Sequence, residues 1–253
     1  MQRLHIQYQE VSIVQNRFLI HRIGCLLCMI GMIMVLGALS YIRTEKLHQV
    51  SAPAPPITLV IDAGHGGDDG GAVTDSGVQE ADLNLSISRR LCVLAELCGL
   101  HTAMTRSSDL IDYPDDAETI AARKVADQKQ RVSFINQIPN AFLISIHQNQ
   151  YPTAQPHGAQ VLYGTTPGSR ECAEPMQETL RAKLDPENRR LAAQISDQIY
   201  LMKNVHCPAV LIECGFLSNP EECSLLQTPE YQIKLTMAIL SSYLQFDQNG
   251  CQT

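Results

Sequence analysis

Three short apolar runs, far apart in the chain, each end at a residue that can bind a metal ion or transfer a proton. The runs are Val60–His65, Phe142–His147 and Ala209–Glu213. Runs of this length and composition predict buried strands. Open α/β sheets collect their reacting groups at the carboxyl ends of their strands. We therefore expect the two histidines and the glutamate to meet at one edge of a sheet.

The chain from residue 57 onward alternates between strand and helix patterns. Apolar residues at intervals of three and four predict a helix that begins near Asp82 and ends at Gly99. Further helices are expected at 118–136, 189–202 and 229–246, further strands at 57–61, 100–105 and 158–163, and a Pro- and charge-rich connection at 174–186. This order predicts an α/β fold, a three-layer sandwich with helices on both faces of a mostly parallel, mixed sheet.

The segment 23–42 is almost wholly apolar and is long enough to cross the hydrocarbon core of a bilayer. We interpret it as a transmembrane anchor or uncleaved signal, preceded by a cytoplasmic segment at 1–22. A Pro/Ala-rich linker at 43–56 then leads to one folded domain at 57–246 and a tail at 247–253. Cleavage near Ala38-Leu39-Ser40 is the alternative. The domain is expected outside the cytoplasm, membrane-anchored or secreted.

Charge excludes nucleic acid as a partner of this domain. Removal of the first 46 residues takes away five of the 19 basic and two of the 26 acidic residues, leaving 14 against 24. Such a surplus of carboxylates repels phosphate. Trp is absent, so no stacking platform for single strands is indicated. The cysteines outside the apolar segment are odd in number and irregularly spaced, which predicts neither a disulfide framework nor a cysteine zinc site.

Four residues of the domain carry candidate chemistry. Glycines beside His65 leave its imidazole open to a ligand. His147 ends a strand, where an isolated histidine is more often a hydrogen-bonded core residue. Glu80 precedes a helix, and its alternative role is to favour the helix dipole. Glu213 ends so apolar a strand that its carboxylate is costly to bury unless it is paired or lies near a cation.

Two imidazoles and one carboxylate form the ligand set of a catalytic zinc, with a fourth position open for water. A second carboxylate outside the ligand set can accept the proton of that water. Zinc lowers the pKa of water to about 7 and polarises the attacked carbonyl. The chemistry that this set predicts is hydrolysis of an amide or an ester.

Three motifs in this chain resemble a known family. The segments Ile61–Gly67, Ser145–Asn149 and Leu211–Asn219, in this order and with Glu80 between the first two, resemble the zinc-dependent N-acetylmuramoyl-L-alanine amidases of the type 3 family. The likeness covers residues 57–244. It implies a phosphorylase/hydrolase-like fold and cleavage of the amide that joins the lactyl group of N-acetylmuramic acid to L-alanine in peptidoglycan.

The resemblance also implies the roles of the site residues. On this basis one Zn²⁺ per chain is held by His65, Glu80 and His147, and Glu213 is the catalytic residue. Peptidoglycan is the expected partner, together with the membrane through the amino-terminal segment, and a regulatory protein partner is left open. Arg131, which also matches the family pattern, is expected to be structural, as a surface ion-pair partner on its helix.

Within the family, the amino-terminal anchor and residues 199–204 are most similar to the germination-specific, spore-cortex branch. Gln150 and the long, charged segment 112–130 depart from the family pattern and bear on substrate fit. Two other functions stay open. One is a zinc exopeptidase acting on peptidoglycan stem peptides, and the other is a non-catalytic wall-binding module, against which a carboxylate at the tip of an apolar strand argues.

Overall fold

The computed structural model describes residues 29–38, 56–196 and 198–250. The chain divides into two compact units, residues 1–54 and residues 55–253. In the first unit, residues 29–38 form a helix. Over the described ranges, no helix combines the length and the apolar character that crossing a bilayer requires. The predicted segment 1–22, most of the linker and both ends of the predicted anchor lie outside these ranges.

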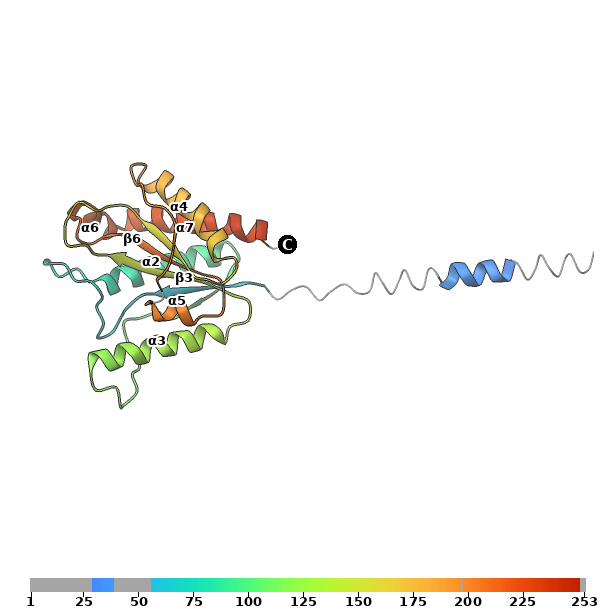
Figure 1. The fold of residues 1–253 in the computed structure, drawn as a ribbon, viewed down its shortest axis with the longest axis horizontal. Helices are drawn as coiled ribbons and strands as arrows, with labels where there is room; N and C mark the ends of the chain where they lie inside the picture. Colours follow the sequence, from blue (N-terminus) through green and yellow to red (C-terminus); the bar gives the residue numbers. More distant parts are fainter. Residues whose placement is uncertain (1–28, 39–55, 197, 251–253) are drawn as a thin grey trace, which may run out of the picture. The chain divides into compact units, whose positions relative to one another are not determined.

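The second unit is built on a six-stranded sheet with the order β2-β1-β3-β6-β4-β5. The strands are β1 (Thr58–Ala63), β2 (His101–Met104), β3 (Ala141–Asn149), β4 (Gln160–Tyr163), β5 (Ala193–Gln194) and β6 (Ala209–Phe216). Strands β2, β1, β3 and β6 are parallel, whereas β4 runs antiparallel to β6 and parallel to β5. The predicted mixed, mostly parallel sheet is confirmed (Figure 1).

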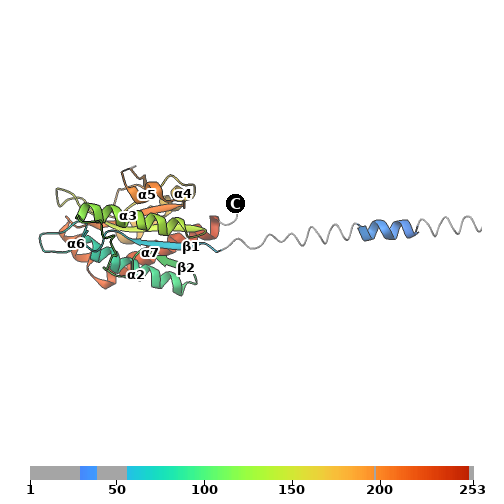
Figure 2. The ribbon, with the colours of Figure 1, turned by 90° about the horizontal axis from the view of Figure 1, so that it is seen from below.

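Helices cover both faces of this sheet, as predicted. They are α2 (Glu80–Leu97), α3 (Ile120–Asn136), α4 (Ser169–Leu184), α5 (Tyr200–Asn204), α6 (Pro220–Leu226) and α7 (Pro229–Gly250). Figure 1 shows α3 and α5 on the opposite side of the sheet from α4 and α7, and Figure 2 gives the view from the side of α3. The α/β sandwich therefore has three layers.

Alternation along the strands decides which face each side chain joins, because successive residues point to opposite sides. In β1, Leu59 and Ile61 pack into the core cluster shared with α2, α4 and α7. Val60 packs into the second cluster, which α3 and α5 complete. Both faces are buried, which is why the strands appear in the sequence as continuous apolar runs.

The same alternation aims the site residues of the central strands. Leu143 of β3 and Leu211 of β6 belong to the cluster beneath α3 and α5. His147 and Glu213 lie an even number of residues further along their strands, so they point to the same face. The candidate chemistry of β3 and β6 therefore faces α3 and α5.

Two predictions about the second half of the domain are wrong. The expected connection at 174–186 is mostly helix α4, which buries Cys172, Met176 and Leu180 at helical spacing and tolerates Pro175 inside it. The expected helix at 189–202 is instead strand β5 followed by a turn and the short α5. Pairing of β5 with β4 supplies backbone hydrogen bonds that override the local helical preference.

The boundaries of other elements also differ from the expectation. Helix α2 begins at Glu80 itself, not after it, and helix α6 was not predicted. Strand β3 continues past His147 to Asn149, with an irregularity in its pairing with β6 between these two residues. Helix α7 runs to Gly250, into the predicted tail.

Candidate metal centre

The imidazoles of His65 and His147 and the carboxylate of Glu80 converge where β1 and β3 end. Their ligand atoms all lie within 4.8 Å of one another. Oε1 of Glu80 is 3.3 Å from Nε2 of His65 and 3.0 Å from Nδ1 of His147. Within the described residues, no other cluster of three or more histidine, cysteine or acidic side chains could hold a metal ion. The structure thus brings together the three residues that the sequence suggested as ligands.

The loop that carries His65 has an unusual backbone. His65 has a φ of 59°, a left-handed conformation that few residues other than glycine adopt. The guanidinium of Arg131 donates to the carbonyl oxygens of Ala63 and His65, at 2.6 Å in each case. Arg106 donates to the carbonyls of Ala63 and Gly64, at 2.9 and 3.1 Å. Two arginines therefore hold the backbone that presents the imidazole.

Arg131 is buried, which corrects its expected place on the surface. Its guanidinium lies 2.8 Å from Asp62 and 2.9 Å from Asp127. Asp62 also accepts hydrogen bonds from Ser145 at 2.6 Å and Thr105 at 2.7 Å. Burial alone would raise the pKa of Asp62, but the charge of Arg131 and the two hydroxyl groups hold it below its ordinary value. This buried pair anchors the end of β1.

Two glycines allow the backbone to lie against the ligands. A β-carbon at Gly64 would overlap the imidazole ring of His147. At Gly71, where φ is 68°, a β-carbon would lie 2.6 Å from Oε2 of Glu80 and 2.8 Å from Cδ2 of His65. Neither position has room for a side chain. The glycines around His65 therefore serve two purposes. They let the backbone turn sharply, and they let it pass close to the ligand side chains.

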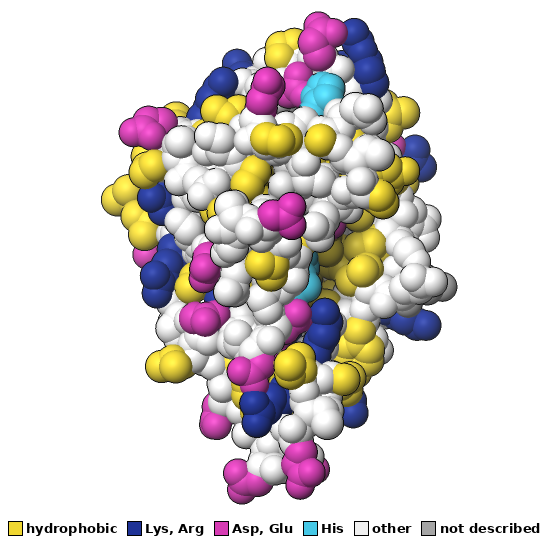
Figure 3. All heavy atoms as spheres, turned by 90° about the vertical axis from the view of Figure 1, so that its left-hand side faces the viewer, with side chains coloured by type: hydrophobic (Ala, Val, Ile, Leu, Met, Phe, Trp, Pro, Cys, Tyr) yellow, Lys and Arg dark blue, Asp and Glu magenta, His cyan; other side chains and the backbone are white. Residues whose placement is uncertain are grey.

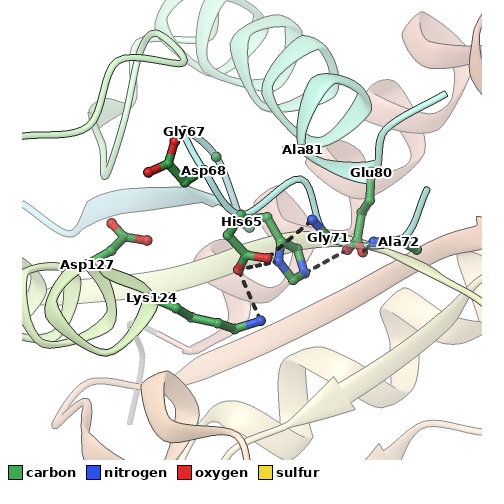
Figure 4. Close-up of polar contacts among 12 residues, drawn as sticks. His65, Gly67, Asp68, Gly71, Ala72, Glu80, Ala81, Lys124 and Asp127 are labelled. Atoms are coloured by element: carbon green, nitrogen blue, oxygen red, sulfur yellow. Dashed lines mark hydrogen bonds and ion pairs between the residues drawn. The ribbon is translucent and has the colours of Figure 1, made fainter. Parts of the chain in front are cut away.

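A second layer of hydrogen bonds orients the ligands. Nδ1 of His65 donates to Asp69 at 2.8 Å, and the Lys124 ammonium lies 3.0 Å from the same carboxylate oxygen (Figure 4). Oε2 of Glu80 accepts from the backbone N–H of Ala72 at 3.0 Å. A carboxylate behind a ligating histidine fixes the ring and makes it more basic. Sequence analysis missed Asp69, although it is the fourth residue after His65.

The side chain of Asn84 connects all three ligand segments and is fully buried. Its amide nitrogen donates to Oε1 of Glu80 at 3.2 Å and to the carbonyl of Gly64 at 3.1 Å. Its oxygen accepts from Nε2 of Gln148 at 3.1 Å, and the backbone N–H of Gln148 donates to Glu80 at 3.1 Å. Asn84 was also missed, and its signal is the i, i+4 spacing from Glu80 on α2.

Charge and hydrogen bonding shift the pKa values of His65 and Glu80 in opposite directions. Burial lowers the pKa of His65, but its contacts with Asp69 and Glu80 reverse this and raise the pKa to about 9. Burial acts to raise the pKa of Glu80, but hydrogen bonds with His147 and His65 hold it far below its ordinary value. The cluster therefore favours a positive charge at its centre, where protons and a metal ion compete for the same atoms.

Glu213 lies beside His147, because the two residues are paired in the parallel ladder of β3 and β6. Its Oε2 is buried and, within the described part of the chain, has no hydrogen-bond partner. Burial raises the pKa of this carboxyl, and the neighbouring His147 opposes the shift only in part. An unpaired, buried carboxylate oxygen next to the ligand cluster is free to accept a proton from a bound molecule.

The four candidate residues line one cavity of about 600 Å³. Its walls are formed by helix α3 and by residues 198–201, which comprise the last two residues before α5 and the first two residues of that helix. Figure 3 shows this face of the molecule with a histidine inside the hollow, charged side chains of both signs close by and hydrophobic side chains along one side. The remaining described histidines lie outside the cluster, and the ring of His157 pairs with Asp185 at 2.6 Å.

An α/β sheet that gathers two imidazoles, a partnered carboxylate and an unpaired carboxylate in one cavity has the composition of a metallohydrolase active site. Residues 59–243 match the family model described as N-acetylmuramoyl-L-alanine amidase. The chain belongs to this family, and the predicted family and enzyme class are confirmed.

Individual relatives agree with this assignment. The chain is 38% identical over 197 residues to the germination-specific N-acetylmuramoyl-L-alanine amidase of Bacillus subtilis, covering 78% of this chain and 82% of that protein. It is 28% identical to the amidase LytC of the same organism, covering 81% of this chain and 38% of LytC. The CwlD amidase from Clostridioides difficile, solved in complex with the GerS lipoprotein, is 35% identical with a TM-score of 0.72, covering 75% of this chain and 98% of that one.

Proposed function

We propose that this chain uses one Zn²⁺ to hydrolyse the amide between the lactyl group of N-acetylmuramic acid and L-alanine in peptidoglycan. One observation carries the proposal. The donor atoms of His65, Glu80 and His147 lie within 4.8 Å of one another, and the unpaired carboxylate of Glu213 lines the same cavity. Family membership supplies the bond that is cut.

The residues present fit a zinc ion. Two imidazoles and one carboxylate are a donor set of catalytic zinc sites. His65, Glu80 and His147 would hold the ion, while Asp69 and Asn84 keep the donor atoms in place. Zinc in such a site lowers the pKa of water to about 7 and polarises a carbonyl group. The carboxylates around His65, which raise its pKa, also favour a bound cation, and this supports zinc at the same place.

Glu213 is the residue that we propose moves the proton. Its Oε2 accepts a proton from the attacking water as the new C–O bond forms at the lactyl carbonyl carbon. The same carboxyl then donates that proton to the L-alanine nitrogen as the C–N bond breaks, because an amide nitrogen leaves readily only when protonated. A pKa raised by burial suits both halves of this exchange.

We further infer that the substrate is peptidoglycan of the spore cortex and that the enzyme acts outside the cytoplasm. The identity to the germination-specific amidase of Bacillus subtilis, which extends over 82% of that protein, supports the first point. The apolar composition of residues 23–42 supports export as an anchored or secreted protein. The complex of CwlD with a lipoprotein supports a protein partner for this chain.

The alternative functions predict different products. A zinc exopeptidase could use the same donor set and the same base, but it would release amino acids from the stem peptide. A wall-binding module would release nothing. Membership of the amidase family favours cleavage at the muramoyl end.

Product analysis tests the proposal directly. The purified protein is incubated with purified peptidoglycan, with and without a chelator, and the products are identified by mass spectrometry. We expect stem peptides with a free amino terminus on L-alanine, intact muramic acid, no product with chelator and recovery on addition of zinc. Free amino acids, or release that is unchanged by chelator, would contradict the bond or the metal.

A further inference from the structure

The cavity extends beyond the four candidate residues as a groove between α3 and residues 198–201. One wall consists of side chains from a single stripe of α3, which are Ala121, Lys124, Val125 and Gln128. Their spacing of three and four residues places them on one face of the helix. The other wall includes Ile199 and Tyr200, where the chain enters α5. Apart from the contact of Lys124 with Asp69, these walls have no part in the proposed metal site.

Among the described residues that line the groove, Lys124 is the accessible cation. Arg131 also lines the cavity, but it is buried and paired with Asp62. The side chain of Lys124 is 47% exposed, and its contact with Asp69 occupies one of the three N–H donors of the ammonium. Figure 4 shows Lys124 extending from α3 toward the loop that carries His65. In a domain with a surplus of carboxylates, this ammonium is the place where a substrate carboxylate can be accommodated.

A second polar group in the groove lacks a partner. The side-chain oxygen of Gln128, one turn of α3 beyond Lys124, is buried and has no hydrogen bond within the described residues. A buried amide oxygen without a donor costs free energy that a bound N–H group would recover. The remaining walls are mainly apolar. Val125, Ile199 and Tyr200 are partly open to solvent, and Gln198 adds one further polar side chain. The groove thus combines mainly apolar surface with the amide groups of Gln128 and Gln198 and one accessible cation.

We propose that this groove binds the stem peptide on the leaving side of the scissile amide, and that Lys124 pairs with a free carboxylate on the residue after L-alanine. The inference rests on the proposed function. Apolar walls suit the alanine methyl group, and Gln128 can accept a peptide N–H. A glycan strand carries many hydroxyl groups and would find few partners on these walls.

The dimensions agree with this placement. Two extended residues span about 7 Å. Lys124 lies one carboxylate away from a candidate metal ligand, since its Nζ is 3.0 Å from Asp69 and Asp69 is 2.8 Å from His65. A carboxylate on the second residue of a peptide cut at the metal centre therefore falls within reach of the ammonium.

The test compares two soluble disaccharide-peptide substrates that differ only at the second stem residue, which carries a free carboxylate in one and a carboxamide in the other. We expect the wild-type protein to prefer the carboxylate by about five- to tenfold in kcat/KM, as for a partly exposed charge-assisted contact. Lys124→Met should bring the ratio close to one mainly by slowing cleavage of the carboxylate form. Lys124→Arg should retain the preference.

Lys129→Met is the matched control. Lys129 is exposed on the same helix but outside the groove, so its loss removes the same charge and should leave the ratio unchanged. If the fragments are too short to be cleaved, the same comparison is made with free stem peptides as inhibitors of peptidoglycan hydrolysis, using their inhibition constants.

Two outcomes would overturn the inference and leave the proposed function intact. One is wild-type cleavage without preference for the carboxylate. The other is a Lys124→Met variant that loses zinc and slows both substrates equally, because Lys124 would then act only through Asp69 and His65. A wild-type protein that cleaves neither the fragments nor polymeric peptidoglycan overturns the proposed function, and this inference with it.

Discussion

Two carboxylates in one cavity, the buried Glu80 and the half-buried Glu213, differ in the partners that surround them. Oxygens of Glu80, at the start of α2, accept from the backbone of Ala72 and Gln148 and from the side chain of Asn84. Oε2 of Glu213, at the tip of β6, has no partner in the described chain. The pKa of Glu80 is accordingly held low and that of Glu213 is raised, although burial acts to raise both.

This difference shows how one cavity can hold both a metal ligand and a proton acceptor. A carboxylate that must stay ionised to bind a cation is surrounded by donors. In Glu213, the proposed proton acceptor, one carboxylate oxygen is instead buried without a hydrogen-bond partner among the described residues. Substitutions of these residues and of their partners should either remove this contrast or reveal its size.

The largest effect is expected from removal of a ligand imidazole. His65→Ala and His147→Ala should abolish stoichiometric zinc and reduce hydrolysis below detection, because two donors cannot hold the ion. Elemental analysis of the purified variants measures the zinc. His101→Ala, an exposed histidine at the start of β2, should keep full zinc and activity. A ligand variant with undiminished zinc would remove that histidine from the proposed set.

Replacement of the unpaired carboxylate should separate the metal from the chemistry. Glu213→Gln should retain zinc and reduce kcat by about 10²- to 10⁴-fold, the range of a general base. Zinc content and kcat are measured on the same preparation. Full activity in this variant would show that Glu213 does not move the proton, and the contrast with Glu80 would then have no catalytic meaning.

The support of the ligand loop can be tested through stability. Arg131→Met leaves the buried carboxylate of Asp62 without its cation and should lower the free energy of unfolding by about 3–5 kcal/mol. The control is Arg123→Met on the same helix, where the ion pair with Asp68 is half-exposed and its loss should cost about 1 kcal/mol or less. Denaturant unfolding gives both values. Equal losses would contradict a buried anchor at the end of β1.

The role of Asn84 in holding Glu80 should appear in metal affinity. Asn84→Ala should weaken zinc binding by about 10- to 100-fold, as for other groups behind metal ligands. Ser88→Ala, one turn further along α2, also alters a fully buried polar residue but removes no described hydrogen bond, and it should leave affinity unchanged. Competition with a chelator measures both. An Asn84→Ala variant that binds zinc as tightly as the wild type would show that Glu80 needs no support from Asn84.

The smallest effect concerns pH and stability. Burial raises the folded-state pKa of Glu213 above its unfolded value. As the pH rises from the unfolded to the folded pKa, the unfolded chain gives up this proton first, so the metal-free protein should lose stability over that interval. The group should have little effect in acid, where both states are mostly protonated. Glu213→Gln should raise the melting temperature at pH 8 but not at pH 4. An equal gain at both values would point to packing instead of ionisation.

Local sequence patterns were sufficient to predict the helices and strands whose apolar residues recur at a regular spacing. Strands β1, β3 and β6 were predicted because both of their faces are buried, which leaves a continuous apolar run. Helix α2 was predicted because its buried side chains recur at helical spacing. Since reacting groups follow strand ends in such sheets, the same apolar runs were enough to indicate His65, His147 and Glu213 as site residues.

Contacts between distant segments were decided only by the tertiary structure. The burial of Arg131 depends on Asp62, 69 positions away, and nothing in the helix sequence around it signals that partner. Helix α4 and strand β5 were missed because packing and pairing with remote elements outweigh their local composition. The spacing of apolar residues shows which face of a helix or strand will be buried. It does not show which distant segment of the chain will pack against that face. For that reason the sequence determined the strand ends and their chemistry, and the fold decided which carboxylate is partnered and which is left free.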